Sequence, residues 1–127
     1  MQARLQNKRT YYLYVIALKR SALKDKRCIK QNPNYEEGPY SRCYYVGASI
    51  EKPEVRYEKH ISQYRNKEGY RTGSSIVRKH GFKRNGLRPK QYEHLNPVYA
   101  SSFEEVVQKE AELAEKLRKR KHFVYQN

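Results

Sequence analysis

The chain has 127 residues, which fits one compact domain, and 28 Lys and Arg against 13 Asp and Glu leave a net charge of +15. So large a positive charge is tolerated most easily beside a polyanion, so we expect nucleic acid as the partner. No apolar run of roughly 18 residues is present, and no amphipathic segment pairs a basic face with a broad apolar one, so we expect no membrane partner. The two cysteines, Cys28 and Cys43, form no CxxC pair. We expect a cytoplasmic protein with free thiols, with one disulfide left open.

The first part of the chain predicts an arm, a strand and a long connection. Residues 1–10 are polar and basic and predict a flexible arm. The stretch 11–18, YYLYVIAL, is rich in strand-forming residues and predicts a buried strand. The connection 19–41 contains Asn-Pro-Asn and Gly-Pro, which favour turns. Long loops are uncommon in small domains unless they are functional, so this inserted loop is a candidate contact surface.

A second strand and two helices are predicted next. The second strand covers 42–48, RCYYVGA. Pro53 suits the first turn of a helix. The core face of that helix is expected to hold Tyr57, Ile61 and Tyr64. Ser74 or Ser75 then caps a short helix that runs through His80 and ends at Gly81.

The last part of the chain predicts a short strand, a long helix and an edge strand. The short strand is expected at 92–95 and the edge strand at 123–127. The long helix, 103–117, begins after Ser102, which stands three residues before Glu105 in a capping box. Together the elements predict an α+β domain: a small three-stranded, mainly antiparallel sheet flanked by helices.

One carboxylate interrupts the apolar stripe of the long helix. The stripe consists of Val106, Leu113 and Leu117. Glu110 falls among them, whereas Glu112 and Glu115 fall on the solvated side. A buried carboxylate costs several kcal/mol unless something compensates it. Glu110 is therefore either a residue at the stripe edge that reaches water or an arginine, or a metal ligand or catalytic carboxylate.

Two further groups could carry chemistry. Arg56 and His60 are four residues apart on one predicted helix face, where a guanidinium can hold a phosphate and an imidazole can move a proton. An exposed face of a basic protein is the alternative. Tyr12 and Tyr14 share one face of the first strand, and Tyr45 lies on the second. Plain strand packing is the alternative for the tyrosines.

In their order along the chain, these residues resemble the GIY-YIG nuclease superfamily. The tripeptide Tyr45-Val46-Gly47 matches the second family motif well, and Tyr12-Leu13-Tyr14 matches the first loosely, with Tyr12 where the family usually has Gly. Arg56 and His60 follow at about the family spacing, and 74–81 is similar to the short helix after them. The stretch around Glu110 is similar to the metal-binding helix, and Asn127 could match a late family Asn. The connection 19–41 departs from the family, which joins its two strands tightly.

The resemblance implies a metal-dependent endonuclease that acts on DNA rather than RNA. Glu110 would bind one Mg²⁺ or Mn²⁺ ion, and Arg56 would neutralise the scissile phosphate. Tyr14 would orient or deprotonate the attacking water, assisted by Tyr45 and His60. The residues expected to contact nucleic acid are Tyr12, Lys59, Arg78, Lys79, Arg118 and Lys119.

Two other functions stay open. One is a non-catalytic, basic module that binds nucleic acid on the same scaffold, and the other is a basic adaptor for an acidic protein. A binder does not need Glu110 near phosphate, because the carboxylate repels the ligand. The cysteines and histidines have no paired zinc spacing, so no structural zinc is expected.

Overall fold

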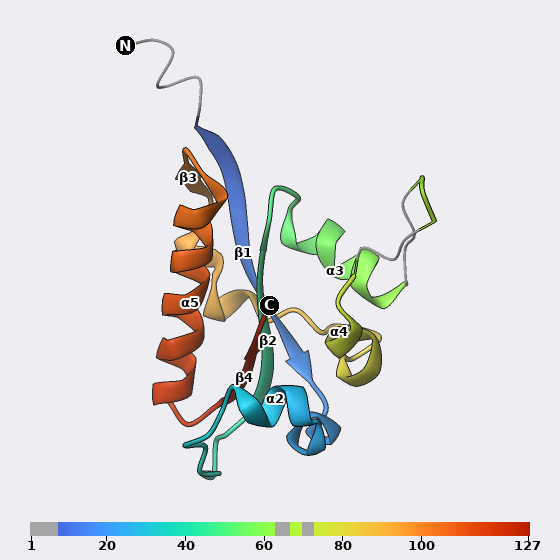
Figure 1. The fold of residues 1–127 in the computed structure, drawn as a ribbon, viewed down its shortest axis with the longest axis vertical. Coiled ribbons are helices and arrows are strands. Elements are labelled where there is room, and N and C mark those ends of the chain that lie inside the picture. Colours follow the sequence, from blue (N-terminus) through green and yellow to red (C-terminus); the bar gives the residue numbers. More distant parts are fainter. Residues whose placement is uncertain (1–7, 63–66, 70–72) are drawn as a thin grey trace.

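The fold is built on a four-stranded sheet in the order β3-β1-β2-β4 (Figure 1). The computed structural model describes residues 8–62, 67–69 and 73–127. The strands are β1 (Arg9–Leu18), β2 (Cys43–Ser49), β3 (Val98–Ala100) and β4 (Phe123–Gln126). β1 pairs antiparallel with β2 and with β3, whereas β2 and β4 are parallel. The predicted α+β class is confirmed, and two of the three strand pairings are antiparallel, but the expected number of three strands is wrong, because β4 adds a parallel edge.

The parallel edge follows from the path of the long helix α5 (Phe103–Lys119). β3 and β4 lie on opposite edges of the sheet, and α5 connects them along one face. Such a crossover brings the chain back in the same direction, which yields a parallel neighbour for β2. Ser102 caps this helix as predicted, since its hydroxyl accepts from the Glu105 amide at 3.4 Å. The Glu105 carboxylate accepts from the Ser101 hydroxyl, so the second half of the predicted capping box is replaced.

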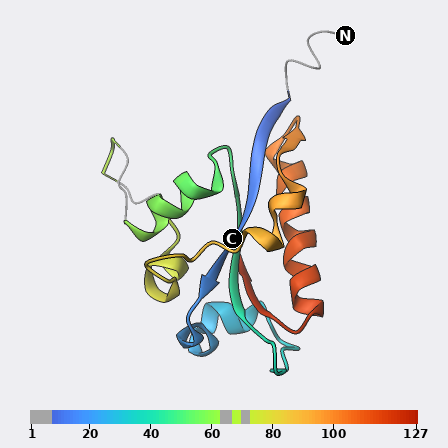
Figure 2. The same cartoon turned by 180° about the vertical axis from the view of Figure 1, so that it is seen from behind.

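Helices cover both faces of the sheet. Figures 1 and 2 show α5 on one side of the strands, with α3 (Pro53–Ile61) and α4 (Ser75–His80) on the other. Pro53 occupies the first turn of α3, and Ser74 and Gly81 cap α4, as predicted. None of the helices in the described part of the chain is long and apolar enough to cross a membrane.

The strand predicted at 92–95 is wrong. Tyr92 separates two short 3₁₀ helices, η2 (Pro89–Gln91) and η3 (Glu93–Leu95), and β3 starts only at Val98. Pro97 has no N–H to donate to a neighbouring strand. The Asn96 side chain pairs with β1 instead: it accepts from the Leu13 amide at 2.8 Å and donates to the Leu13 carbonyl at 2.7 Å.

The connection 19–41, expected as a long inserted loop, contains helical turns. It contains η1 (Arg20–Lys24) and α2 (Lys26–Lys30), and Asp25 caps α2 by accepting from the Arg27 amide at 2.9 Å. At the other end of the chain, β1 begins at Arg9, so the last two residues of the predicted arm are strand. Residues 1–7 of that arm, and Tyr64 of the predicted α3 core face, lie outside the described residues.

The segment 19–41 also closes the outer edge of β4. The Asn32 side chain donates to the Val124 carbonyl at 2.8 Å and accepts from the Val124 amide at 3.0 Å. Gln31 repeats this pattern on Gln126, at 2.9 and 2.7 Å. The two side-chain amides therefore occupy the backbone groups that a fifth strand would otherwise use.

Candidate active site

Tyr14 and Gly47 face each other across β1 and β2. They are direct partners in the strand register. A Cβ atom on Gly47 would lie 2.5 Å from both Cζ and Oη of Tyr14, so the tyrosine ring occupies the space above the glycine. Tyr45 is directly opposite Ile16, which places it on the same face as Tyr14. The two tyrosine rings have centroids 6.2 Å apart.

His60 reaches this pair from α3. Its Nε2 lies 3.0 Å from the Tyr14 hydroxyl, and its Nδ1 accepts from the Ser74 backbone amide at 2.7 Å. Because Nδ1 accepts, the ring proton of neutral His60 sits on Nε2 and is donated to the Tyr14 oxygen. Burial, together with the charges of Arg56 and Arg78, lowers the pKa of His60 to about 3, which keeps the ring neutral.

The start of α4 holds His60 in place, and sequence reasoning missed this contact. A Cβ atom on Gly73 would lie 2.9 Å from the His60 Cα, so α4 can approach α3 closely there. Ser74 caps α4 through its hydroxyl and also hydrogen-bonds Tyr45, which lowers the pKa of that tyrosine. The capping motif was visible in the sequence, but nothing local to it indicated His60 or Tyr45 as partners.

The charges of Arg56 and Glu110 act on both tyrosines. Burial raises the pKa of Tyr14 to about 12, and the Arg56 guanidinium beside it lowers that pKa through its charge and a hydrogen bond. Burial also raises the pKa of Tyr45 well above its usual value. The Glu110 carboxylate raises the pKa of both tyrosines, so it is electrostatically coupled to them.

Glu110 approaches from the α5 side of the sheet. It is buried on the same stripe as Val106, Leu113 and Leu117, as the helical periodicity predicts, and it is 3% exposed. β4 ends at Gln126, opposite Val46, so β2 is an edge strand from Gly47 onward within the described residues. Groups from the two faces of a sheet come closest around such an edge. The Arg56 charge acts on Tyr14, Tyr45 and His60, and the Glu110 charge acts on both tyrosines, so the five candidate catalytic residues form one electrostatically coupled group.

The Glu110 carboxylate is incompletely paired. Burial raises its pKa to about 7, and a hydrogen bond from the Gln126 side chain lowers it. Its Oε1 has no hydrogen-bond partner among the described residues. An unpaired buried acceptor is costly and calls for a compensating ion, water or ligand.

A single carboxylate suits only some metals. The described residues contain no group of three or more His, Cys, Asp or Glu side chains that could hold a metal ion. Mg²⁺ usually binds one or two carboxylates and completes its octahedral shell with water and phosphate oxygens. The unpaired Oε1 of Glu110 fits that donor set.

The expected nucleic-acid contacts fall into two groups. Tyr12, Lys59, Arg78 and Lys79 lie on β1, α3 and α4, the elements that carry Tyr14 and His60. Lys79 is exposed, whereas Lys59 forms a 2.6 Å ion pair with Glu51. Arg78 donates to the Gly73 carbonyl at 2.7 Å.

Arg118 and Lys119 lie away from this group, at the C-terminal end of α5, about 12 Å along the helix from Glu110. The Arg118 guanidinium donates to the Val124 carbonyl at 3.1 Å and to the side chains of Gln31 and Asn32, so it supports the cover of β4. Asn127 has an exposed side chain, and its backbone amide donates to Val46 at 3.4 Å.

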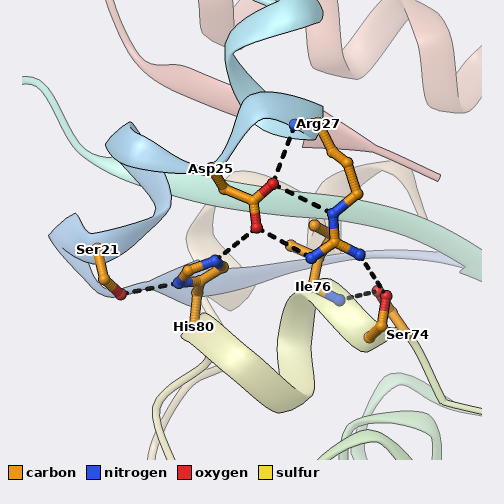
Figure 3. Close-up of polar contacts among 7 residues, drawn as sticks. Ser21, Asp25, Arg27, Ser74, Ile76 and His80 are labelled. Atoms are coloured by element: carbon orange, nitrogen blue, oxygen red, sulfur yellow. Dashed lines mark hydrogen bonds and ion pairs between the residues drawn. The ribbon is translucent and has the colours of Figure 1, made fainter.

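A second polar cluster, which sequence reasoning did not find, ties the segment 19–41 to α4 (Figure 3). The Nε2 of His80 lies 2.8 Å from Asp25, and its Nδ1 lies 2.8 Å from the Ser21 hydroxyl. Arg27 donates to both Asp25 oxygens and, at 2.7 Å, to the Ser75 hydroxyl. The cluster thus anchors the helix whose first turn holds His60.

Sheet, helices and site together define an α+β protein in which a group of buried polar side chains lies between the sheet and its helices. Comparison of the chain with family models, with curated proteins and with solved structures gave no match.

Proposed function

We propose that this protein is a metal-dependent endonuclease of the GIY-YIG type, which hydrolyses phosphodiester bonds in DNA in preference to RNA. One observation carries the proposal: a buried carboxylate, Glu110, has an unpaired oxygen and is coupled to Tyr14 and Tyr45 in a chain of net charge +15. A module that only binds nucleic acid gains nothing from this group, because a carboxylate repels phosphate and its burial destabilises the fold.

The positively charged part of the site suits the transition state of phosphodiester hydrolysis. When water attacks phosphorus in line, negative charge builds on the non-bridging and leaving oxygens. The Arg56 guanidinium, which acts on Tyr14 and on His60, can stabilise that charge with two parallel hydrogen bonds. A divalent cation at Glu110 would supply further positive charge and polarise a water molecule.

Tyr14 and His60 would orient the attacking water. His60 donates its Nε2 proton to the Tyr14 oxygen, so the tyrosine hydroxyl proton points to another acceptor. His60 is not the general base in this arrangement, because Nδ1 is occupied and Nε2 carries the proton. The Tyr14 pKa of about 12 already includes the lowering by Arg56, so Tyr14 can take a proton only if further positive charge lowers that pKa.

The test is cleavage of single-stranded DNA, duplex DNA and RNA in the presence of Mg²⁺. We expect the wild type to cut DNA and Glu110→Ala to lose at least about 100-fold in rate, as for loss of one electrostatic stabiliser. Glu112→Ala, an exposed carboxylate on the same helix, is the matched control. Equal cleavage by wild type and Glu110→Ala would reject the role of Glu110. Salt-sensitive binding without cleavage by the wild type would favour the non-catalytic module.

A further inference from the structure

A pocket of about 290 Å³ lies where β1 ends and β2 begins, and residues from both strands line it. Ala17 and Tyr44, which are direct partners in the register, are among them. Because side chains alternate along a strand, these two residues face away from Tyr14 and Tyr45. In the described part of the chain, the residues around this pocket include no Asp or Glu.

Two arginines in this pocket lack a negative partner. Among the described residues, neither Arg42 nor Arg88 takes part in an ion pair. Arg42, Arg88 and Tyr44 line the same pocket, and both guanidinium charges lower the pKa of Tyr44, which burial raises. Arg20 also lines the pocket, but its charge is paired with Glu37 at 2.5 Å. Two unpaired guanidiniums beside one hydroxyl are suited to a phosphate.

The groups are held in position without a ligand. One nitrogen of Arg42 donates to the Ser41 carbonyl at 3.1 Å, and one nitrogen of Arg88 donates to the Leu87 carbonyl at 2.9 Å. Each guanidinium has five N–H donors, so both retain donors for a ligand. The Tyr44 ring packs edge-on against His122, with centroids 5.0 Å apart. Side chains that are already held in position lose less conformational entropy when a ligand binds.

An aromatic side chain borders the same pocket. Phe82 is 38% exposed and lines the pocket with its aromatic ring accessible to solvent. Its backbone is fixed, because Gly81 bridges to Leu18 and the Phe82 carbonyl accepts from the Tyr57 hydroxyl at 2.5 Å. An exposed ring beside cations is the arrangement on which unpaired bases stack in proteins that bind single strands.

We propose that this pocket binds one nucleotide of a single-stranded nucleic acid. The phosphate lies between Arg42, Arg88 and the Tyr44 hydroxyl, and the base stacks on Phe82. The site goes beyond the proposed cleavage reaction and does not depend on it, since it shares no residue with the group around Glu110. A duplex, whose bases are already stacked, cannot use Phe82 in this way.

The first test measures fluorescence anisotropy of a labelled single-stranded DNA of about eight nucleotides, in EDTA and at several salt concentrations. We expect Arg42→Gln to weaken binding about 3- to 10-fold and to reduce the salt slope by about 0.7, the value for one phosphate on a single strand. Tyr44→Phe keeps the ring and should weaken binding about threefold. Phe82→Ala should weaken binding about 5-fold without changing the slope.

The matched control variants each remove a positive charge or an aromatic ring outside the pocket. Lys24→Gln removes one exposed charge, and Phe103→Ala removes an aromatic side chain that is 51% exposed. Both should bind within twofold of the wild type. The proposal is rejected if Arg42→Gln and Phe82→Ala, shown to unfold cooperatively at the wild-type temperature, bind no more weakly than these controls.

Competition identifies the source of the phosphate. If the pocket binds a nucleotide of a strand, a deoxynucleoside monophosphate should displace the labelled DNA better than inorganic phosphate does. In Phe82→Ala the two competitors should then be equally effective. Equal competition by both would overturn the nucleotide assignment in favour of a simple anion site. Loss of cleavage in Glu110→Ala with unchanged binding of the labelled strand would separate this site from the proposed catalytic one.

Discussion

Glu110 combines a cost in stability with a proposed role in catalysis. Burial raises its pKa to about 7, whereas a glutamate in an unfolded chain has a pKa of about 4.3. Between these two values the folded state binds more protons than the unfolded state. The free energy of unfolding therefore falls as the pH rises from about 4.3 to about 7, and the whole penalty is present above pH 7.

Replacing Glu110 by Gln removes this titration. We expect Glu110→Gln to match the wild type at about pH 4 and to be more stable at about pH 8 by on the order of 1–3 kcal/mol. Urea denaturation at both values, without divalent ions, measures the difference. Glu112→Gln, on the exposed side of α5, should change little at either pH. A stability difference that does not depend on pH would contradict the prediction.

Metal binding at Glu110 should be visible without any substrate. A ligand that binds only the folded state stabilises it, by about 2.7 kcal/mol at 100 times its dissociation constant. We therefore expect millimolar Mg²⁺ to raise the melting temperature of the wild type at pH 8 and to leave that of Glu110→Gln unchanged. The same shift in both proteins would show that Mg²⁺ binds elsewhere.

Gly47 is required because Tyr14 fills the space over it. A Cβ atom would lie 2.5 Å from the tyrosine ring, so Gly47→Ala must displace the ring or separate the strands. We expect a loss of about 1–3 kcal/mol in stability, together with weaker cleavage. Gly38→Ala is the control, because its nearest neighbour would lie 3.5 Å from the new Cβ. Thermal melts and cleavage rates that are equal for both variants would argue against this packing.

Among the elements, the segment 19–41 acts as a cover for β4. The Asn32 amide is buried and satisfies both backbone groups of Val124, which would otherwise lie unpaired. Because Gln126 hydrogen-bonds Glu110, this cover also steadies the strand that supports the proposed site.

Removing the Asn32 side chain should open the β4 edge. We expect Asn32→Ala to cost about 1–3 kcal/mol for the unpaired backbone groups and to increase aggregation on heating. Asn34→Ala, an exposed residue in the same segment, should cost less than about 0.5 kcal/mol. Denaturation midpoints and light scattering distinguish the two variants. Equal midpoints would mean that water replaces the Asn32 contacts.

In the molecule as a whole, a net charge of +15 predicts strong dependence on salt. Each phosphate neutralised releases counterions, so several contacts together weaken binding steeply as salt rises. We expect the affinity for duplex DNA to fall at least roughly tenfold between about 50 and 200 mM salt. Anisotropy titrations with an uncleaved substrate in EDTA measure it. A flat response would exclude a mainly electrostatic interface and favour recognition of another partner.

Local patterns predicted part of the fold and of the site. Strands β1 and β2, the caps of α4 and α5, and the buried position of Glu110 follow from periodicity and capping, which depend on residues within a few positions. The start of β3 could not be predicted in this way, because the Asn96 side chain pairs with the Leu13 backbone, a partner 83 residues away. The cover of β4 by Asn32 depends on a partner 92 residues away.

The sequence by itself determined that the chain is strongly basic, that two tyrosine strands precede a helix with Arg56 and His60, and that one carboxylate sits on an apolar helix face. Only the tertiary structure decided which groups meet. It placed the Ser74 amide on His60, Gln126 beside Glu110, and Arg118 on the β4 cover instead of in the group around Tyr14. The physical reason is the separation of the interacting residues along the chain. Helix and strand patterns arise from neighbours in sequence. The pKa shifts, unpaired atoms and hydrogen-bond partners arise instead where segments far apart in the chain bury one another.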